Sequence, residues 1–240
     1  PQNMVRAGIP IGDLGGGMFG VMGILAALYE REGSGVGQHV DISMLDCQIS
    51  MLNYMATMHF LSGEDPYPIG NSHFVHVPYN TFTCSDGCIV IAVITDNFWA
   101  NLKQVVSCPE FDNAKYDTQP GRWQDKELIN NSLNRILSEN TCRYWLTELE
   151  ARRIPCAPVN SLSQALADTQ VLHREMVVDL KHPNGNMTKG PGNPIKLSRS
   201  CDQDFTPAPT LGQHTDEVMT QLLNLSVEQI EQMKEQGIIK

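Results

Sequence analysis

An acidic residue at the start of a glycine-rich apolar stretch is the feature of this sequence that most suggests chemistry. Ile11-Gly12-Asp13 leads directly into residues 14–31, which contain five glycines and many apolar residues and predict a helix. A carboxylate near a helix N-terminus is held ionised by the helix dipole, so Asp13 is a candidate nucleophile for covalent catalysis. A simpler interpretation stays open: Asp13 caps the helix by accepting hydrogen bonds from its free N–H groups.

The same glycine-rich stretch matches a dinucleotide-binding pattern. Residues 15–20 read G-x-G-x-x-G, and Asp41 follows at about the distance of a ribose-binding acid. That pattern binds a pyrophosphate only where the glycines form the turn between a buried strand and a helix. Residues 4–10 are too short for such a strand and end in proline. We therefore expect the glycines to permit close approach of a neighbouring element or a ligand to the backbone.

Two histidines and two cysteines have the donor atoms of a zinc site. His73 and His76 precede Cys84 and Cys88, and zinc binds tetrahedrally to such sets. The two cysteines flank an expected hairpin turn, where buried thiols act as small apolar side chains. Ordinary packing is the favoured interpretation, and we expect no bound metal.

Motifs and composition exclude several further classes of function. The sequence contains neither a G-x-S-x-G elbow nor a recognisable cysteine-nucleophile signature. A formal net charge of −10 with scattered Lys and Arg argues against a nucleic-acid partner. Seven cysteines, an odd number without a disulfide framework, are typical of a reducing compartment, so we expect a cytoplasmic or organelle-matrix location. The apolar run 14–29 is about one turn short of a membrane span of ~20 residues, so we interpret it as a buried helix and expect no membrane partner.

Hydrophobic periodicity indicates the elements that must position these residues. After the first helix we expect a short strand at 38–43, a helix at 44–61 and a proline-rich loop at 64–78. A hairpin and three helices should follow, and then further short elements. The expected hairpin strands are 79–83 and 88–94, and the helices are 96–106, 126–138 and 141–152. Strands at 176–180 and 195–197 and helices at about 215–223 and 227–236 complete the α/β pattern.

Six short motifs are spread over nearly the whole chain. They are residues 11–13 with the helix end 26–31, residues 35–46, Pro78-Tyr79 with Asp86-Gly87, residues 154–159, residues 190–194 and residues 211–215. Together and in this order they resemble the family III CoA-transferases. That group includes formyl-CoA, carnitinyl-CoA and succinyl-CoA dicarboxylate transferases and the related methylacyl-CoA racemases.

The resemblance implies an α/β fold with two domains, in which a Rossmann-like large domain and a small α+β domain are joined by long linkers. Two such subunits would thread through each other as an interlocked homodimer. Residues 1–77 would be large-domain helices and linker, 78–155 the small domain, and 156–240 a linker and the return to the large domain. The first half of the large domain would be missing, which should leave apolar surface of the first helices uncovered unless a partner or the missing segment covers it.

The family's catalytic aspartate lies in the Gly-Asp that begins this helix, so the resemblance gives that role to Asp13. It implies an aspartyl anhydride followed by an enzyme thioester, with the CoA thioester as substrate and no permanently bound cofactor. The family's CoA contacts lie upstream and map onto no residue here. The loop 70–79 should face the active site, so the resemblance suggests His73, His76 and Tyr79 as substrate contacts. A plain hinge loop with exposed histidines is the alternative.

The resulting hypothesis is transfer of CoA from an acyl-CoA to a small free carboxylic acid, of the EC 2.8.3 type, with a dicarboxylate-type acceptor. Three alternatives stay open. An acyl-CoA racemase of the same superfamily would share the Gly-Asp. A non-catalytic fragment or assembly subunit would account for a missing half, and a zinc-binding module would use the histidines and cysteines.

Overall fold

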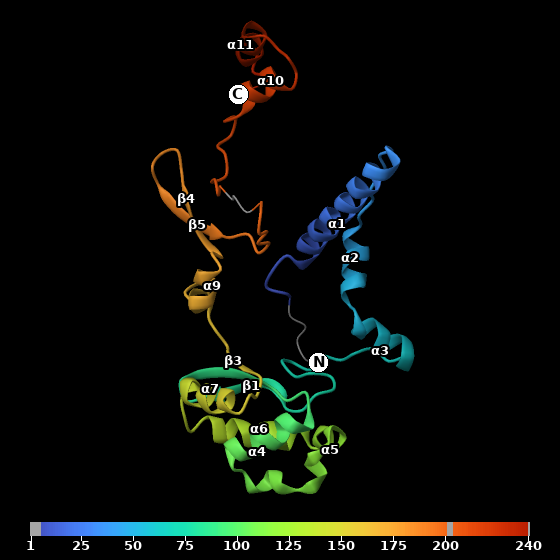
Figure 1. Cartoon of the computed structure of the whole chain (residues 1–240), viewed down its shortest axis with the longest axis vertical. Helices are drawn as coiled ribbons and strands as arrows, with labels where there is room; N and C mark the ends of the chain where they lie inside the picture. Colours follow the sequence, from blue (N-terminus) through green and yellow to red (C-terminus); the bar gives the residue numbers. More distant parts are fainter. Residues whose placement is uncertain (1–5, 201–203, 240) are drawn as a thin grey trace. The chain divides into compact units, whose positions relative to one another are not determined.

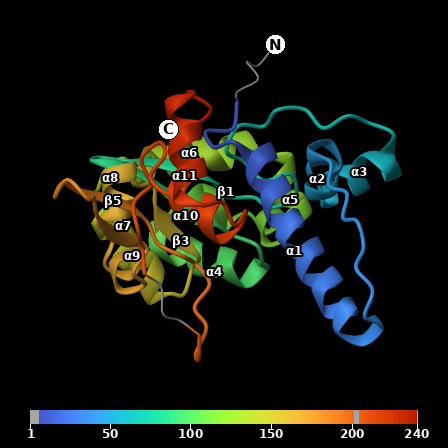
Figure 2. The same ribbon diagram turned by 90° about the horizontal axis from the view of Figure 1, so that it is seen from above.

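A computed structural model describes residues 6–200 and 204–239 of the chain. The chain forms two compact units, Pro1–Pro158 and Val159–Lys240, and each is described here by itself. Figure 1 and Figure 2 show the order of the helices and strands along the chain. Both units contain helices and small antiparallel sheets, which confirms the α/β class.

The first helix is longer than its sequence pattern indicates. Helix α1 spans Ile11–Ser34, with Pro10 at its N-cap and Gly35 in the left-handed conformation at its C-cap (φ 73°). Asp13 therefore lies inside the first turn, and no side chain caps this end. The interpretation of Asp13 as the helix cap is wrong, because the proline starts the helix three residues earlier.

The region after α1 differs from the expected strand and single helix. Residues 38–43 are extended but form no strand, since no described segment pairs with them. Helix α2 spans Met44–Met51, capped by the Ser43 hydroxyl, which accepts from the Asp46 N–H. Helix α3 spans Tyr54–Ser62 and is separated from α2 by Asn53, whose positive φ of 50° interrupts the helical path.

The glycines of α1 permit close packing against the chain that follows. A Cβ on Gly15 would lie 2.6 Å from the Met51 methyl, and one on Gly23 would lie 2.8 Å from Val40 Cγ1. Both distances are shorter than real Cβ contacts, so a larger residue would require the neighbouring side chain to move, which the flexible Met51 can do more easily than Val40. This confirms close backbone approach for these two glycines, and no strand precedes them in residues 6–10.

The rest of α1 is exposed within this chain. Gly15 is its one buried residue, which overturns the expectation that the helix is buried on several faces. The apolar residues of α1 that are more than a third exposed are Ile11, Leu14, Met18, Val21, Met22, Ile24, Leu25, Leu28 and Tyr29. They form the uncovered apolar surface that the resemblance implies. By length and composition α1 is also able to cross a membrane, a test that core helices of soluble proteins pass as well.

A three-stranded antiparallel sheet organises the α/β part of the first unit. Strand β1 spans Tyr79–Cys84 and β2 spans Gly87–Ala92, which confirms the hairpin. Strand β3, Cys156–Pro158, pairs with the other edge of β2. Along β2, Ile89 and Ile91 are fully buried and the alternate residues Cys88, Val90 and Ala92 are half-buried, so one face of the sheet lies on the core.

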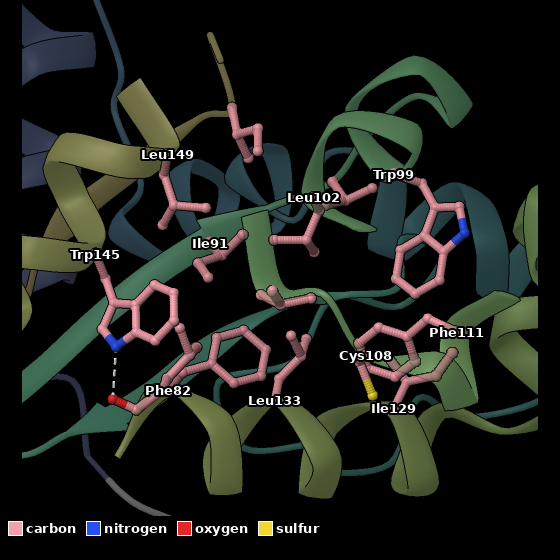
Figure 3. Close-up of a cluster of buried hydrophobic side chains, with 14 of the residues drawn as sticks. Phe82, Ile91, Trp99, Leu102, Cys108, Phe111, Ile129, Leu133, Trp145 and Leu149 are labelled. Atoms are coloured by element: carbon pink, nitrogen blue, oxygen red, sulfur yellow. Dashed lines mark hydrogen bonds between the residues drawn. The ribbon is translucent and has the colours of Figure 1, made fainter. Parts of the chain in front are cut away.

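Three amphipathic helices cover that face. Helix α4 spans Asp96–Val106, α6 spans Lys126–Leu137 and α7 spans Cys142–Ala151, close to their expected bounds. Figure 3 shows their side chains meeting those of the sheet. Fully buried members of this core are Phe82, Ile89, Ile91, Leu102, Phe111, Ile129, Leu133 and Leu149. Trp145 joins it by donating its Nε1–H to the carbonyl of Leu137 at 2.7 Å.

Short helices between α4 and α6 were not expected from the sequence. Two 3₁₀ turns, Pro109–Asp112 and Ala114–Asp117, lead to helix α5 at Gln119–Gln124. A Cβ on Gly121 would overlap the carbonyl oxygen of Lys115, so α5 reaches its position because residue 121 has no side chain.

The second unit consists of short helices and one hairpin. Strand β4 (Val177–Lys181) pairs with β5 (Met187–Pro191), and Gly185 takes a positive φ of 86° in the turn. The expected strand at 195–197 is wrong, because the partner of β4 lies nearer in sequence, across this tight turn. Helices α8 (Leu162–Leu166) and α9 (Thr169–His173) precede the hairpin, and α10 (Thr215–Gln221) and α11 (Val227–Glu235) follow it.

Candidate functional site

Asp13 is placed as a free carboxylate near the start of a long helix. Asp13 is exposed, and no hydrogen bond or ion pair joins its side chain to the part of the chain that the structure describes. The four free N–H groups at a helix N-terminus carry partial positive charge, which favours a carboxylate there. An accessible, unpaired carboxylate of this kind can attack an electrophilic carbonyl.

His73, His76 and Tyr79 lie together in the loop that leads into β1. The imidazole of His73 is stacked on the Tyr79 ring, with 5.1 Å between centroids and 15° between planes. Its distance to the His76 ring is 4.8 Å, and Tyr54 of α3 stacks at 6.3 Å. The structure thus brings the three predicted residues together in one ring cluster.

His73 also organises the loop through its own hydrogen bonds. Its Nδ1 accepts from the backbone N–H groups of Val75 at 2.9 Å and His76 at 3.2 Å. An Nδ1 that accepts must be unprotonated, so the remaining proton of a neutral ring resides on Nε2. Burial, followed by the neighbouring His76, lowers the pKa of His73 below its ordinary value. The ring is therefore held in its neutral form.

Helix α5 anchors the other side of the loop. The buried guanidinium of Arg122 donates from Nε to the carbonyl of Val77 and from Nη2 to the carboxylate of Asp96, each at 2.8 Å. Gln119 Nε2 donates to the carbonyl of Val75 at 2.6 Å. The Val77–Pro78 peptide bond between loop and strand is cis. Side chains 44 and 45 residues away in sequence thus fix the backbone carbonyls of Val75 and Val77.

A cavity of about 190 Å³ lies between this loop and helices α5 and α6; we call it the loop–helix cavity. His73, His76 and Tyr79 line it together with Trp123, Lys126, Glu127 and Asn130, while residues 67–69, Ser72 and Val77 complete its wall. Within the described chain, Nδ1 of His76 and Oδ1 of Asn130 are buried and lack a hydrogen-bond partner. Both atoms are enclosed by protein and present no surface to the cavity, so they are unpaired polar groups within its wall.

A cation lies at the same cavity. The ammonium of Lys126 is 4.7 Å from the centre of the Trp123 ring, which it contacts as a cation–π pair. Sequence reasoning missed Trp123, Lys126 and Asn130 because their helices meet the loop only through tertiary packing. Trp123, Lys126 and Asn130 recur at helical spacing, but nothing in that spacing indicates that they face His76.

The histidines and cysteines considered as zinc ligands do not gather. Among the described residues no group of three or more His, Cys, Asp or Glu side chains can hold a metal ion. Cys84 is buried in the sheet, and burial, with a smaller effect of the nearby Cys142 thiol, raises its pKa to about 12. Such a thiol is almost never a thiolate near neutral pH, so Cys84 is a poor nucleophile.

Comparisons with known proteins place these observations in context. The family described as CoA-transferase family III matches residues 1–215. Among curated proteins, succinyl-CoA:glutarate CoA-transferase of Mus musculus is 30% identical over 98% of this chain and 54% of its own length. Succinyl-CoA:mesaconate CoA-transferase of Haloarcula hispanica is 31% identical over 89% of this chain and 54% of its own length. The chain spans about half the length of these relatives.

A solved structure has the same arrangement. A CAIB/BAIF family protein from Brucella suis superposes with a TM-score of 0.78 and 27% identity, covering 92% of this chain and 58% of that protein. The fold is therefore shared with a longer protein over nearly all of this sequence.

Proposed function

Because the chain belongs to CoA-transferase family III, we propose that it serves in the transfer of CoA from an acyl-CoA to a free carboxylic acid. The match to this family over residues 1–215 is the observation that carries the proposal. Relatives that act on glutarate and mesaconate support an acceptor with two carboxylates. Transferase names among the relatives also favour transfer over racemisation.

We propose Asp13 as the nucleophile. Its carboxylate attacks the thioester carbonyl, the C–S bond breaks, and CoA leaves as a thiolate with a mixed anhydride on Asp13. The thiolate then attacks the aspartyl carbonyl, which releases the first acid and leaves CoA on Asp13 as a thioester. The acceptor carboxylate displaces that thiolate to form a second anhydride, and the thiolate finally attacks the acceptor's acyl carbon, which restores Asp13.

Two features of Asp13 support this assignment. Asp13 lies in the first turn of helix α1, where the free N–H groups of a helix generally favour a negative charge. The exposed side chain has no partner in the described chain that a substrate would have to displace. Splitting one transfer into anhydride and thioester steps lowers the barrier of each, as covalent catalysis does in general.

The proposal extends to the substrate contacts, the cofactor, the domains, the assembly and the location of the protein. His73, His76 and Tyr79 would contact the substrate, and CoA enters as a substrate without a permanent cofactor. Residues 78–155 would be the small domain, with 1–77 and 156–240 belonging to the large domain and its linkers. We propose a homodimer of interlocked subunits in the cytoplasm or an organelle matrix.

Acyl exchange followed by mass spectrometry tests the function. The full chain is incubated with succinyl-CoA and a mixture of glutarate, mesaconate and oxalate, and new CoA thioesters are measured. We expect Asp13→Asn to lower the rate by about 10³-fold or more, because the covalent route is lost. Glu32→Gln, at the far end of the same helix, is the matched control and should retain the rate.

Two results would contradict the proposal. Undiminished exchange by the Asp13→Asn variant would exclude Asp13 as the nucleophile. Epimerisation of a 2-methylacyl-CoA without an acceptor acid, with no exchange, would identify a racemase instead.

A further inference from the structure

A glutamine of α2 lies against the backbone that carries Asp13. A Cβ on Gly12 would lie 3.3 Å from Nε2 and 3.7 Å from Oε1 of Gln48, so this amide rests beside the residue that precedes Asp13. Consecutive Cα atoms are about 3.8 Å apart, which places Nε2 of Gln48 at most about 9 Å from the Cα of Asp13. Gln48 is thus a polar side chain of a second helix at the proposed nucleophile.

The position of Gln48 in the contact between the two helices is unusual for a polar residue. Helix α2 lies along α1 (Figure 1), and the side chains of Met44, Gln48 and Met51 meet the α1 glycines. Residues 44, 48 and 51 recur at helical spacing, which is typical of an apolar packing face. Packing alone would therefore favour a third apolar side chain at residue 48.

The amide of Gln48 has donor capacity to spare. Its Nε2 donates to the carbonyl of Met44 at a long 3.3 Å, and within the described residues the side chain makes no other hydrogen bond. The amide nitrogen carries a second N–H that this bond does not use. Gln48 and Asp13 are both exposed, so rotation about their side-chain bonds can bring the amide to the carboxyl group.

The proposed reaction requires such a donor at Asp13 itself. When the thiolate attacks the aspartyl carbonyl of the anhydride, an electron pair moves onto the Asp13 carboxyl oxygen and returns as the first acid leaves. The same oxygen takes up charge again when the acceptor carboxylate attacks the thioester on Asp13. Donors aimed at an oxygen that becomes negative in the transition state accelerate acyl transfer, and glutamine side chains can serve as such donors.

Resting on the proposed transfer reaction, we infer that the Gln48 amide donates a hydrogen bond to the Asp13 carboxyl oxygen while the enzyme thioester forms and while it breaks down. Gln48 is then a catalytic residue of these two steps. The first attack places its charge on the acyl oxygen of the substrate instead, so Gln48 has a smaller effect on that step.

Single-turnover mass spectrometry of the intact full chain tests the inference. The chain is mixed with succinyl-CoA in the absence of an acceptor acid, and the rate at which CoA becomes attached to the protein is measured. In Gln48→Met we expect this rate to fall about 10²-fold, the usual cost of losing one donor to a developing oxyanion. Gln104→Met, at an exposed position of α4, is the matched control and should keep the rate.

Two further measurements separate catalysis from packing. A methionine at residue 48 matches its neighbours Met44 and Met51, so Gln48→Met should keep or raise the thermal unfolding midpoint while the rate falls. Gln48→Glu keeps the size and polarity of the side chain but has no N–H when ionised, so it should be at least as slow as Gln48→Met.

The outcomes distinguish this inference from the proposed function. Attachment of CoA to folded Gln48→Met or Gln48→Glu at the unmodified rate overturns the inference, and the transfer reaction stands. A slowed rate with a lowered unfolding midpoint in Gln48→Met, or equal slowing in Gln104→Met, also overturns it. If the unmodified chain takes up no CoA and exchanges none, the transfer reaction is refuted and the role of Gln48 falls with it.

Discussion

The imidazole of His73 lies flat against the ring of Tyr79, with 5.1 Å between their centroids. The same imidazole accepts two backbone hydrogen bonds on Nδ1. One side chain therefore both stacks on Tyr79 and holds the backbone of the loop. A histidine used in this way must stay neutral, because protonation of Nδ1 removes the acceptor. His73 therefore shapes the cavity wall by holding the backbone of Val75 and His76 in place.

This role of His73 predicts a pH-dependent stability. In the unfolded chain a histidine takes up a proton near pH 6.5, whereas the lowered pKa of folded His73 delays that uptake to more acidic pH. Between these values the unfolded state binds more protons, so the contribution of His73 is complete above about pH 6.5 and is lost as the pH falls below it. Urea unfolding from pH 8 to pH 5.5 measures the slope. His73→Asn, whose amide oxygen can replace Nδ1 as acceptor, should flatten it; an identical slope in the variant would contradict the assignment.

Removing the buried guanidinium of Arg122 should destabilise the first unit strongly. Arg122→Met leaves the carbonyls of Val77 and Tyr116 without their donor, and we expect a loss of about 3–5 kcal/mol in unfolding free energy. Arg135→Met is the control, because Arg135 is exposed and its ion pair with Glu110 is long at 3.6 Å; its effect should stay below about 1 kcal/mol. Thermal and urea unfolding measure both, and equal losses would show that Arg122 does not hold the loop.

The absence of a side chain at residue 121 should also matter for stability. Gly121→Ala places a methyl group against the carbonyl oxygen of Lys115, which is backbone and can move only with its 3₁₀ turn. We expect a loss of about 1–3 kcal/mol or more, as for overpacked interiors. Gly33→Ala, where a Cβ meets no atom within 4 Å, should change stability by less than about 1 kcal/mol and in the favourable direction. Similar unfolding midpoints for the two variants would disprove the close contact.

Local patterns in the sequence predict most of the helices and the first hairpin. Helices α4, α6 and α7 follow from apolar residues at helical spacing, and β1 and β2 from the apolar runs on either side of Ser85-Asp86-Gly87. The break at Asn53 escapes this reasoning, since residues 44–61 keep helical spacing across the residue whose φ of 50° interrupts the helix. The strand expected at 38–43 is absent for a different reason. Its alternating sequence favours a strand, but a strand also needs a partner, and no described segment pairs with these residues.

The candidate site is less accessible from sequence. Asp13 and the loop histidines are identified by resemblance to a family, because no spacing joins them. Lys126 and Asn130 line the same cavity as His76 although about 50 residues of chain separate them, and this arrangement is decided by how α6 packs against the sheet. Such long-range contacts leave no local pattern, so the loop–helix cavity appears only in three dimensions.

The hydrogen bonds at the end of β2 carry a consequence for how this protein could have been assembled. Val93 donates to the carbonyl of Pro78, where the chain enters the sheet, and Ala92 donates to the carbonyl of Pro155, where it leaves. The entry and exit points are therefore neighbours, and the flanking residues Val77 and Cys156 still pack into the core between them. A body attached at one place can be inserted into, exchanged between or removed from host proteins as a single piece, and the loop of residues 67–77 must accompany it for the cavity to persist.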